Sequence, residues 1–287
     1  MLGTLSTGFL AACSTGSTSS PSQGDTARSG LPTFLYPAFP VGFGSESVSV
    51  ARTQQRFTFV LRDDIDIMRA KAPDTATIAI TLAGSPIGKQ VAARHDDGII
   101  TPYYPVEFVP PQAGQYEASM PDFPDIEPVA FLVRDKAEVT IPFVGDPMRS
   151  VDTPTFGIHR GVEPVCTRAV PCPFHELNLA DVLHNGRPTV MVIATPGFCQ
   201  TDICGPVVDL LIDAAPARPD IDFIHAEVYN DPSVFQTGKF PATTPAVDIN
   251  ELPFEPVLYV ADIDATIVAT LSTTWDRTEL ATALSAV

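Results

Sequence analysis

The sequence predicts two domains, an all-β sandwich over residues 45–148 and an α/β domain over residues 152–287. The length of 287 residues is long for one hydrophobic core and sufficient for two. Between residues 45 and 143, short runs of β-branched and aromatic residues alternate with turn sequences, which favours antiparallel strands. After residue 151, apolar runs alternate with helix start and stop signals, which is typical of an α/β fold.

Residues 1–12 are predicted to be a signal peptide, and residues 13–44 an unstructured tether. The stretch Leu10-Ala11-Ala12-Cys13 resembles the lipobox of bacterial lipoproteins. That resemblance implies that Cys13 is lipidated and that the protein is extracytoplasmic and held at the cell membrane by its lipid. The run before Cys13 is short and lacks basic residues, so either the true start lies upstream or the match is chance. No other segment approaches the ~20 apolar residues of a membrane span.

The net charge limits the kinds of binding partner that we expect, and the proline content limits the length of the helices and strands. The chain carries 34 acidic and 17 basic residues, a formal net charge of −17. Such a chain repels phosphate backbones, so we expect no nucleic-acid partner. Its 29 prolines are disfavoured inside helices and central strands, which predicts short elements and ordered loops.

The N-terminal strands are predicted from apolar alternation between turn sequences. The expected strands cover residues 56–61, 75–82, 104–109, 130–133 and 137–143, and the expected turns cover residues 83–86, 96–98 and 110–114. The segment "QAGQYEA", residues 112–118, resembles the return strand of immunoglobulin-like folds, which implies an immunoglobulin-like sandwich. The chain has no disulfide there, so the resemblance concerns architecture alone.

The C-terminal elements follow the order strand, helix, strand, β-hairpin, helix. Before them, residues 177–186 predict a short helix capped by Asn178 and ended by Gly186. The expected strands cover residues 189–194, 221–229, 256–261 and 266–271, and the expected helices cover residues 207–214 and 277–284. The run 189–194 is apolar at nearly every position, as in a strand buried on both faces. Asp276 is the expected cap of the last helix.

The cysteines outside the lipobox number four, and an even number in an oxidising compartment favours two disulfides. Of the three possible connectivities, Cys166–Cys172 and Cys199–Cys204 close the shortest loops and are favoured. The segment "CTRAVPCPFH" is loop-like, with a proline on each side of Cys172, so we expect a structural disulfide there.

Residues 172–287 resemble the thioredoxin superfamily, in particular its membrane-tethered bacterial members. The stretch "LNLADVLHNGRPTVMVIATPGFC" parallels their helix, strand and cysteine-bearing loop, and "FEPVLYV" parallels the segment that starts with a cis-proline. The resemblance implies that Cys199 is the attacking thiolate, that Cys204 is the resolving thiol and that Pro256 faces them. The family's Cys-x-x-Cys is absent, because Asp202 stands where the second cysteine is expected.

The resemblance implies thiol–disulfide exchange with protein thiols and disulfides of the cell envelope, without a cofactor or a metal ion. The alternative is a non-catalytic binding or scaffold protein locked by structural disulfides, so whether the chain is an enzyme stays open. "TPGFCQTDIC" also resembles Q-type peroxiredoxins, but their arginine is missing from "FEPVLYV". A copper-delivery site with His175 and His225 is disfavoured, because the cysteine spacing differs from that of thioredoxin-like copper proteins.

Overall fold

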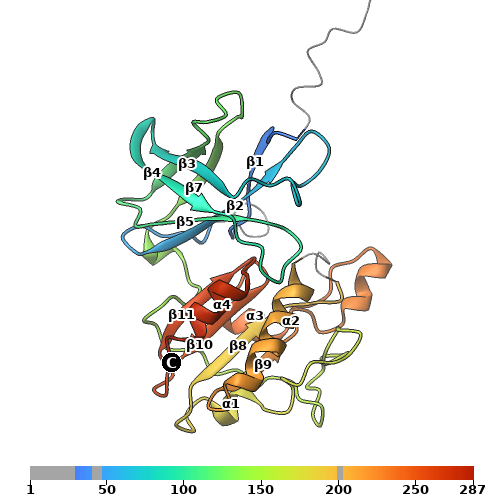
Figure 1. The fold of residues 1–287 in the computed structure, drawn as a ribbon. Helices are drawn as coiled ribbons and strands as arrows, with labels where there is room; N and C mark the ends of the chain where they lie inside the picture. Colours follow the sequence, from blue (N-terminus) through green and yellow to red (C-terminus); the bar gives the residue numbers. More distant parts are fainter. Residues whose placement is uncertain (1–29, 41–46, 199–202) are drawn as a thin grey trace, which may run out of the picture.

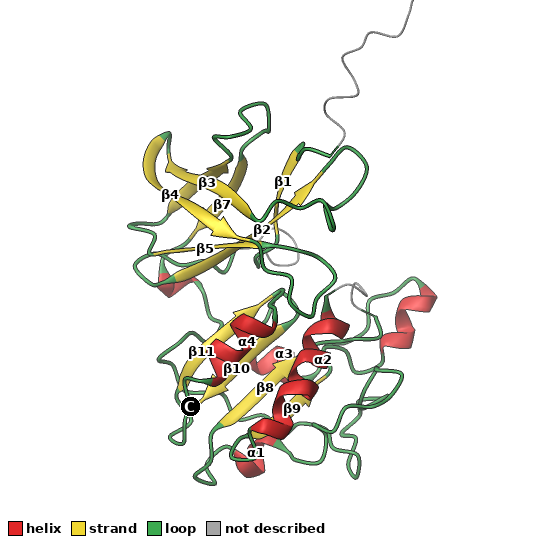
Figure 2. Cartoon of the chain, viewed as in Figure 1, coloured by secondary structure: helices red, strands yellow, loops and turns green. Residues whose placement is uncertain are grey.

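The computed structural model describes residues 30–40, 47–198 and 203–287. It is mostly β in the N-terminal half, and its α-helices lie in the C-terminal half (Figures 1 and 2). The strands are β1 Phe34–Pro37, β2 Gln55–Arg62, β3 Thr75–Leu82, β4 Ser85–Ala93, β5 Tyr104–Phe108, β6 Gly114–Ser119, β7 Val129–Val133, β8 Thr189–Ile193, β9 Asp222–Ala226, β10 Val257–Ala261 and β11 Ile267–Ser272. The α-helices are α1 Leu179–Val182, α2 Cys204–Ala214, α3 Pro245–Asn250 and α4 Arg277–Leu284, and the 3₁₀ helices are η1 Lys136–Glu138, η2 Ala215–Ala217 and η3 Pro232–Thr237.

The N-terminal half contains two antiparallel sheets, in the orders β1-β2-β5 and β4-β3-β6-β7. Alternate residues of β3 (Ala76, Ile78 and Ile80) are buried, as expected of a strand with one face in a core. Side chains from both sheets meet in one apolar cluster, in which the rings of Phe57 and Phe131 lie 4.9 Å apart. The two sheets therefore share a core.

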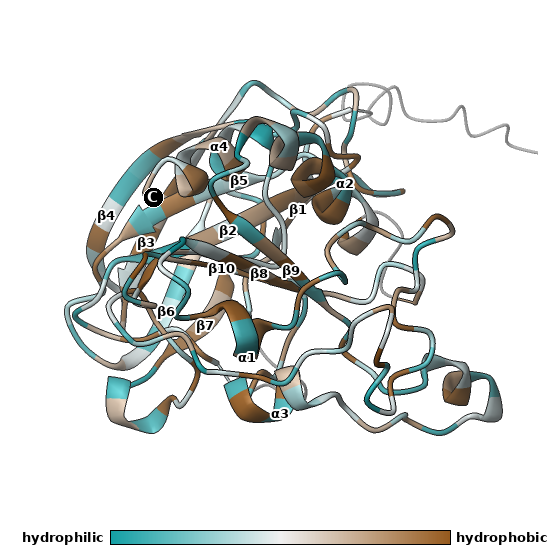
Figure 3. Cartoon of the chain, turned by 90° about the horizontal axis from the view of Figure 1, so that it is seen from below, coloured by the Kyte–Doolittle hydropathy of each residue, from teal (hydrophilic) through white to brown (hydrophobic). Residues whose placement is uncertain are grey.

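The C-terminal half contains one mixed sheet, in the order β11-β10-β8-β9, with only β8 and β9 parallel. All five residues of β8, β9 and β10 are buried, because helices cover both faces. One core cluster joins residues of α2 and α4 to one face, and another joins residues of α1 and α3 to the other face. Figure 3 shows the apolar character of the central strands β8 and β10. The sequence-based expectation of a sheet with helices is confirmed for this half.

Several elements differ from the sequence prediction. Residues 34–37 were predicted to belong to the tether, but they form β1. This strand pairs with residues 59–62 of β2. The turn expected at residues 83–86 is tighter than predicted, and the chain continues directly into β4, an exposed edge strand. Residues 137–143 form no strand. The apolar residues Ile141 and Phe143 of this segment instead pack into the core of the C-terminal half.

A largely buried ion pair connects the two halves. Arg56 of β2 donates Nε to Glu279 Oε1 of α4 at 2.7 Å and Nη2 to Glu279 Oε2 at 2.5 Å. Its Nη2 also donates to the Thr274 carbonyl at 2.8 Å. The Tyr103 hydroxyl donates to the Glu279 carboxylate and accepts from the Asp276 amide at 2.9 Å. The two halves thus share a polar contact as well as apolar ones.

Within the described residues, no helix combines the length and the apolar character needed to cross a bilayer. Cys13 and the predicted signal peptide lie outside these residues.

Candidate functional site

One edge of the mixed sheet brings several polar side chains together. β8 and β9 are parallel, so their carboxyl ends meet at the same edge, and β10 starts there because it runs antiparallel to β8. Thr195 follows β8, Glu227 follows β9, and Glu255 and Pro256 precede β10. In open α/β sheets this edge is where ligand and reaction sites usually lie.

Cys204, the predicted resolving cysteine, is the first residue of α2 and is fully buried. It is disulfide-bonded, and neither Cys166 nor Cys172 is its partner, because both are free. Cys199, the predicted nucleophile, lies outside the described residues. The helix starts three residues before the predicted Val207, and Pro206 fits its first turn because the first N–H groups of a helix have no intrahelical acceptor.

Glu255, the residue before Pro256, lies beside the Cys204 sulfur. The Glu255–Pro256 peptide bond is cis, as the thioredoxin resemblance implied for Pro256. Glu255 Oε2 accepts a hydrogen bond from the Thr195 amide at 2.9 Å and lies 3.7 Å from Cys204 Sγ. Burial raises the pKa of Glu255 to about 7, against partial opposition from the Thr195 hydrogen bonds. Near neutral pH this carboxyl group can therefore both give and take a proton.

The carboxyl group of Glu227 is buried, since the residue is only 1% exposed, and it joins two loops. Its oxygens accept from the Thr167 amide at 2.6 Å and from the Thr167 hydroxyl at 3.1 Å. Thr167 Oγ1 in turn accepts from the Gly197 amide at 2.9 Å. Only glycine fits at Gly197, because a Cβ there would lie 2.5 Å from the Thr167 carbonyl oxygen. Burial raises the pKa of Glu227 to about 7.

The cysteines predicted to form a structural disulfide, Cys166 and Cys172, are free thiols in the structure. They lie beside two buried histidines, and the ligand atoms of Cys166, Cys172, His175 and His225 all lie within 4.8 Å of one another. His225 Nδ1 is 3.3 Å from Cys172 Sγ, 4.0 Å from Cys166 Sγ and 3.0 Å from His175 Nε2. Both sulfurs thus lie near His225 Nδ1, and no disulfide bond joins them. We call these four residues the Cys/His cluster.

The surroundings of the two thiols in the Cys/His cluster shift their pKa values in opposite directions. The hydrogen bond with Cys172 lowers the pKa of Cys166 strongly, and contacts with His175 and His225 lower it further. The pKa of Cys172 is raised by its hydrogen bond with Cys166 and by burial. Burial lowers the pKa of His175. Burial also opposes protonation of His225, but contacts with Cys166 and Glu227 outweigh it and raise that pKa. These surroundings favour loss of the proton from Cys166 over loss from Cys172.

A third group of possible ligands, His95, Asp276 and Glu279, lies between the two halves. Its carboxylates are already paired: Glu279 with Arg56, and Asp276 with His95 Nδ1 at 3.1 Å. Asp276 also caps α4 by accepting from the Glu279 amide, as predicted. This group holds the halves together and needs no ion for charge balance.

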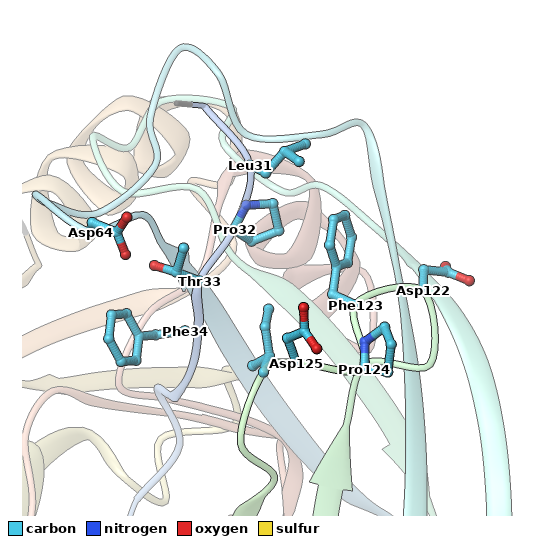
Figure 4. A pocket seen from close by; sticks show the side chains of 10 residues that line it. Leu31, Pro32, Thr33, Phe34, Asp64, Asp122, Phe123, Pro124 and Asp125 are labelled. Carbon is cyan, nitrogen blue, oxygen red and sulfur yellow. The ribbon is translucent and has the colours of Figure 1, made fainter. Parts of the chain in front are cut away.

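A surface hollow lies beside β1 (Figure 4). Its walls are apolar and acidic: Leu31, Pro32, Thr33, Phe34, Asp64, Asp122, Phe123, Pro124, Asp125 and Ile126. It contains no cysteine, histidine or buried carboxyl group, so the functional site is better placed at the sheet edge.

Comparisons of the chain with protein-family models, curated proteins and solved structures found no match.

Sequence reasoning missed the carboxyl groups of Glu227 and Glu255. The sequence pattern does not distinguish Glu227, which is buried, from a surface carboxylate such as Asp209, which is exposed and pairs with Arg168. The available signals were the position of Glu227 at the end of the apolar run 221–229 and the position of Glu255 directly before the predicted cis-proline.

Proposed function

We propose that the C-terminal half is a thioredoxin-like domain that performs thiol–disulfide exchange through Cys199 and Cys204. The observation that carries the proposal is the disulfide-bonded Cys204 at the start of α2, with its sulfur 3.7 Å from Glu255 Oε2. A carboxyl group with a pKa near 7 next to a buried sulfur suits a thiol that must lose and regain a proton.

The sheet supports the thioredoxin-like assignment. A central β8 lies between a parallel β9 and an antiparallel β10, α2 follows β8 directly in the described chain, and the hairpin β10–β11 precedes α4. This is the element order that the resemblance implied. For the N-terminal half we propose an immunoglobulin-like sandwich. Its support is the Tyr116 hydroxyl, which donates to the Gln112 carbonyl at 2.7 Å, as in the tyrosine corner of such domains.

The proposed exchange assigns a separate task to each group. In the reduced protein, the Cys199 thiolate attacks a sulfur of a protein disulfide, and the other sulfur leaves as a thiolate. Cys204 then gives its proton to Glu255 and attacks the mixed disulfide at the Cys199 sulfur. This second attack releases the partner's other thiolate and restores the Cys199–Cys204 disulfide, so two electrons pass from the pair to the partner. Pro256 lies beside Glu255 and would shape the surface that receives the partner.

Variants of the two cysteines test the proposal. Cys204→Ser should accumulate mixed disulfides with partner proteins, because no resolving thiol remains, and Cys199→Ser should accumulate almost none. Both should lose at least ~100-fold in catalysed reduction of a protein disulfide. Non-reducing electrophoresis and a turbidity assay give the two readouts. Equal behaviour of both variants and the unmodified chain would contradict the proposal.

The second candidate is a non-catalytic scaffold in which the Cys204 disulfide is structural. The full burial of Cys204 favours it, because structural disulfides are typically inaccessible. The two candidates differ in how easily the disulfide is reduced.

We further propose that the protein is exported and anchored by lipid at Cys13, where it would meet disulfide-bonded partners of the cell envelope. The support is the sequence "LAAC" followed by a Ser/Thr/Gly-rich run. Cys13→Ala should abolish incorporation of a labelled fatty acid and leave a larger precursor. Equal labelling of the variant and the unmodified chain would exclude Cys13 as the lipid site.

A further inference from the structure

The Cys/His cluster has no task in the proposed exchange reaction, and yet its four side chains converge in the interior. Cys166 is 7% exposed, His175 is 1% exposed, and Cys172 and His225 are fully buried. Cys166, Cys172 and His175 come from the loop before α1, whereas His225 belongs to β9. Thiols and imidazoles buried together at such distances form the ligand set of closed zinc sites.

We propose that Cys166, Cys172, His175 and His225 form a tetrahedral binding site for a zinc ion, with Sγ, Sγ, Nε2 and Nδ1 as the ligand atoms. Zn–S and Zn–N bonds of about 2.3 and 2.0–2.1 Å place the ligand atoms of a tetrahedron about 3.3–3.8 Å apart. The distances from His225 Nδ1 to the other three ligand atoms are 3.0, 3.3 and 4.0 Å. Adjustments of a few tenths of an ångström would bring these three edges to tetrahedral values, and the remaining edges are each within 4.8 Å.

The surroundings of His225 orient it as a ligand. Its Nε2 lies 3.0 Å from the Ala194 carbonyl oxygen, which can only accept, so Nε2 carries a hydrogen. The lone pair of Nδ1 is then available on the side of the two sulfurs. A backbone carbonyl behind the imidazole is the usual outer-shell partner of a metal-binding histidine. The Cys172 amide donates to Cys166 Sγ at 3.4 Å and supports a thiolate there.

Charge balance selects zinc among the ions that accept sulfur and imidazole. Two thiolates and Zn²⁺ give a neutral unit, whereas Cu⁺ would leave one negative charge in the core. That charge would lie beside Glu227, whose Oε1 is 4.0 Å from His225 Nε2. Ca²⁺ and Mg²⁺ prefer oxygen ligands. With four protein ligands no position is open for a substrate, so the ion would fix the loop before α1 to β9.

Metal content of the full chain tests the site. After anaerobic purification without chelator, we expect one zinc per chain by inductively coupled plasma mass spectrometry. Cobalt(II) in place of zinc should give the visible bands of a tetrahedral thiolate site. Cys172→Ser and His225→Gln should each weaken zinc binding by more than the roughly 10–100-fold cost of losing an outer-shell partner. His184→Gln is the matched control, because His184 is exposed and should leave the zinc content unchanged.

Thiol accessibility in the unmodified chain tests the site even where a ligand variant fails to fold. Alkylation followed by peptide mass spectrometry should find Cys166 and Cys172 protected with zinc and modified after a chelator removes it. The double variant Cys199→Ser/Cys204→Ser should still bind zinc, so failure of thiol exchange leaves this result unchanged. A Cys166–Cys172 disulfide in the anaerobic protein, free thiols without bound zinc or cobalt, or a preference for copper(I) in competition would overturn the zinc site.

Discussion

Replacing Glu279 with glutamine is expected to lower the free energy of unfolding by about 3 kcal/mol, the low end of the cost of breaking a buried ion pair. The side chains of Arg56 and Glu279 are only 13% and 12% exposed. The variant leaves the Arg56 guanidinium charged, because arginine does not lose its proton in proteins. Urea denaturation followed by circular dichroism and by fluorescence of Trp275, the only tryptophan, measures the change.

Two further variants test whether the loss of stability comes from leaving the Arg56 charge buried without a partner. Arg56→Met combined with Glu279→Leu should recover at least half of the lost stability, because it removes both charges and retains apolar volume. Arg277→Ala is the matched control, since Arg277 also pairs across the two halves, with Asp97, but its side chain is 47% exposed. It should change stability by less than about 0.5 kcal/mol. Equal losses in Glu279→Gln and Arg277→Ala would show that burial of the pair is irrelevant.

Replacing Glu255 with glutamine is expected to make the protein more stable at pH 8 while leaving it nearly unchanged at pH 4. Burial raises the pKa of Glu255 from 4.5 to about 7, so the folded state holds this proton more tightly than the unfolded state. The contribution to stability is therefore complete below about pH 4.5 and is lost as the pH rises through 7. The gain at pH 8 is on the order of 2 kcal/mol, discounted because the side chain is partly exposed.

The same variant should slow thiol exchange near neutral pH by roughly 10²-fold, because Cys204 loses its proton acceptor. Unfolding free energies between pH 4 and 8 and exchange rates give two independent readouts. Glu176→Gln, at an exposed position, is the control and should alter neither. Unfolding free energies that follow the same pH profile in Glu255→Gln and in the unmodified chain would contradict the assigned environment of Glu255.

The elements predictable from the sequence are those whose local pattern agrees with their packing. The run 75–82 has one buried face and was predicted with the bounds of β3. The last helix, with Asp276 as its cap, was predicted over the same residues as α4. Strand β4 was missed because most of its residues are exposed at a sheet edge, so it shows no apolar alternation. Residues 137–143 were wrongly predicted as a strand, because their apolar side chains pack against the C-terminal half and not within a sheet of the N-terminal half.

The candidate site was only partly predictable, for a similar reason. Cys204 and Pro256 stand in local motifs and could be found from the sequence. Glu255 reaches the amide of Thr195, 60 positions away, and His225 lies 53 positions from Cys172. Contacts of this kind depend on strand order and on which face of a strand a residue occupies. The local pattern of "CTRAVPCPFH" suggested a disulfide. It contains no sign of His225, which belongs to β9 and lies next to both sulfurs.

The reduction potential of the Cys204 disulfide tests the proposed thiol exchange most directly. The protein is equilibrated in thiol–disulfide buffers of known potential, free thiols are alkylated, and the peptide containing Cys204 is quantified by mass spectrometry. If the disulfide takes part in thiol exchange, its potential lies well above about −300 mV, in the range of disulfides that exchange with protein partners. A potential below about −300 mV would identify a structural disulfide and contradict the account.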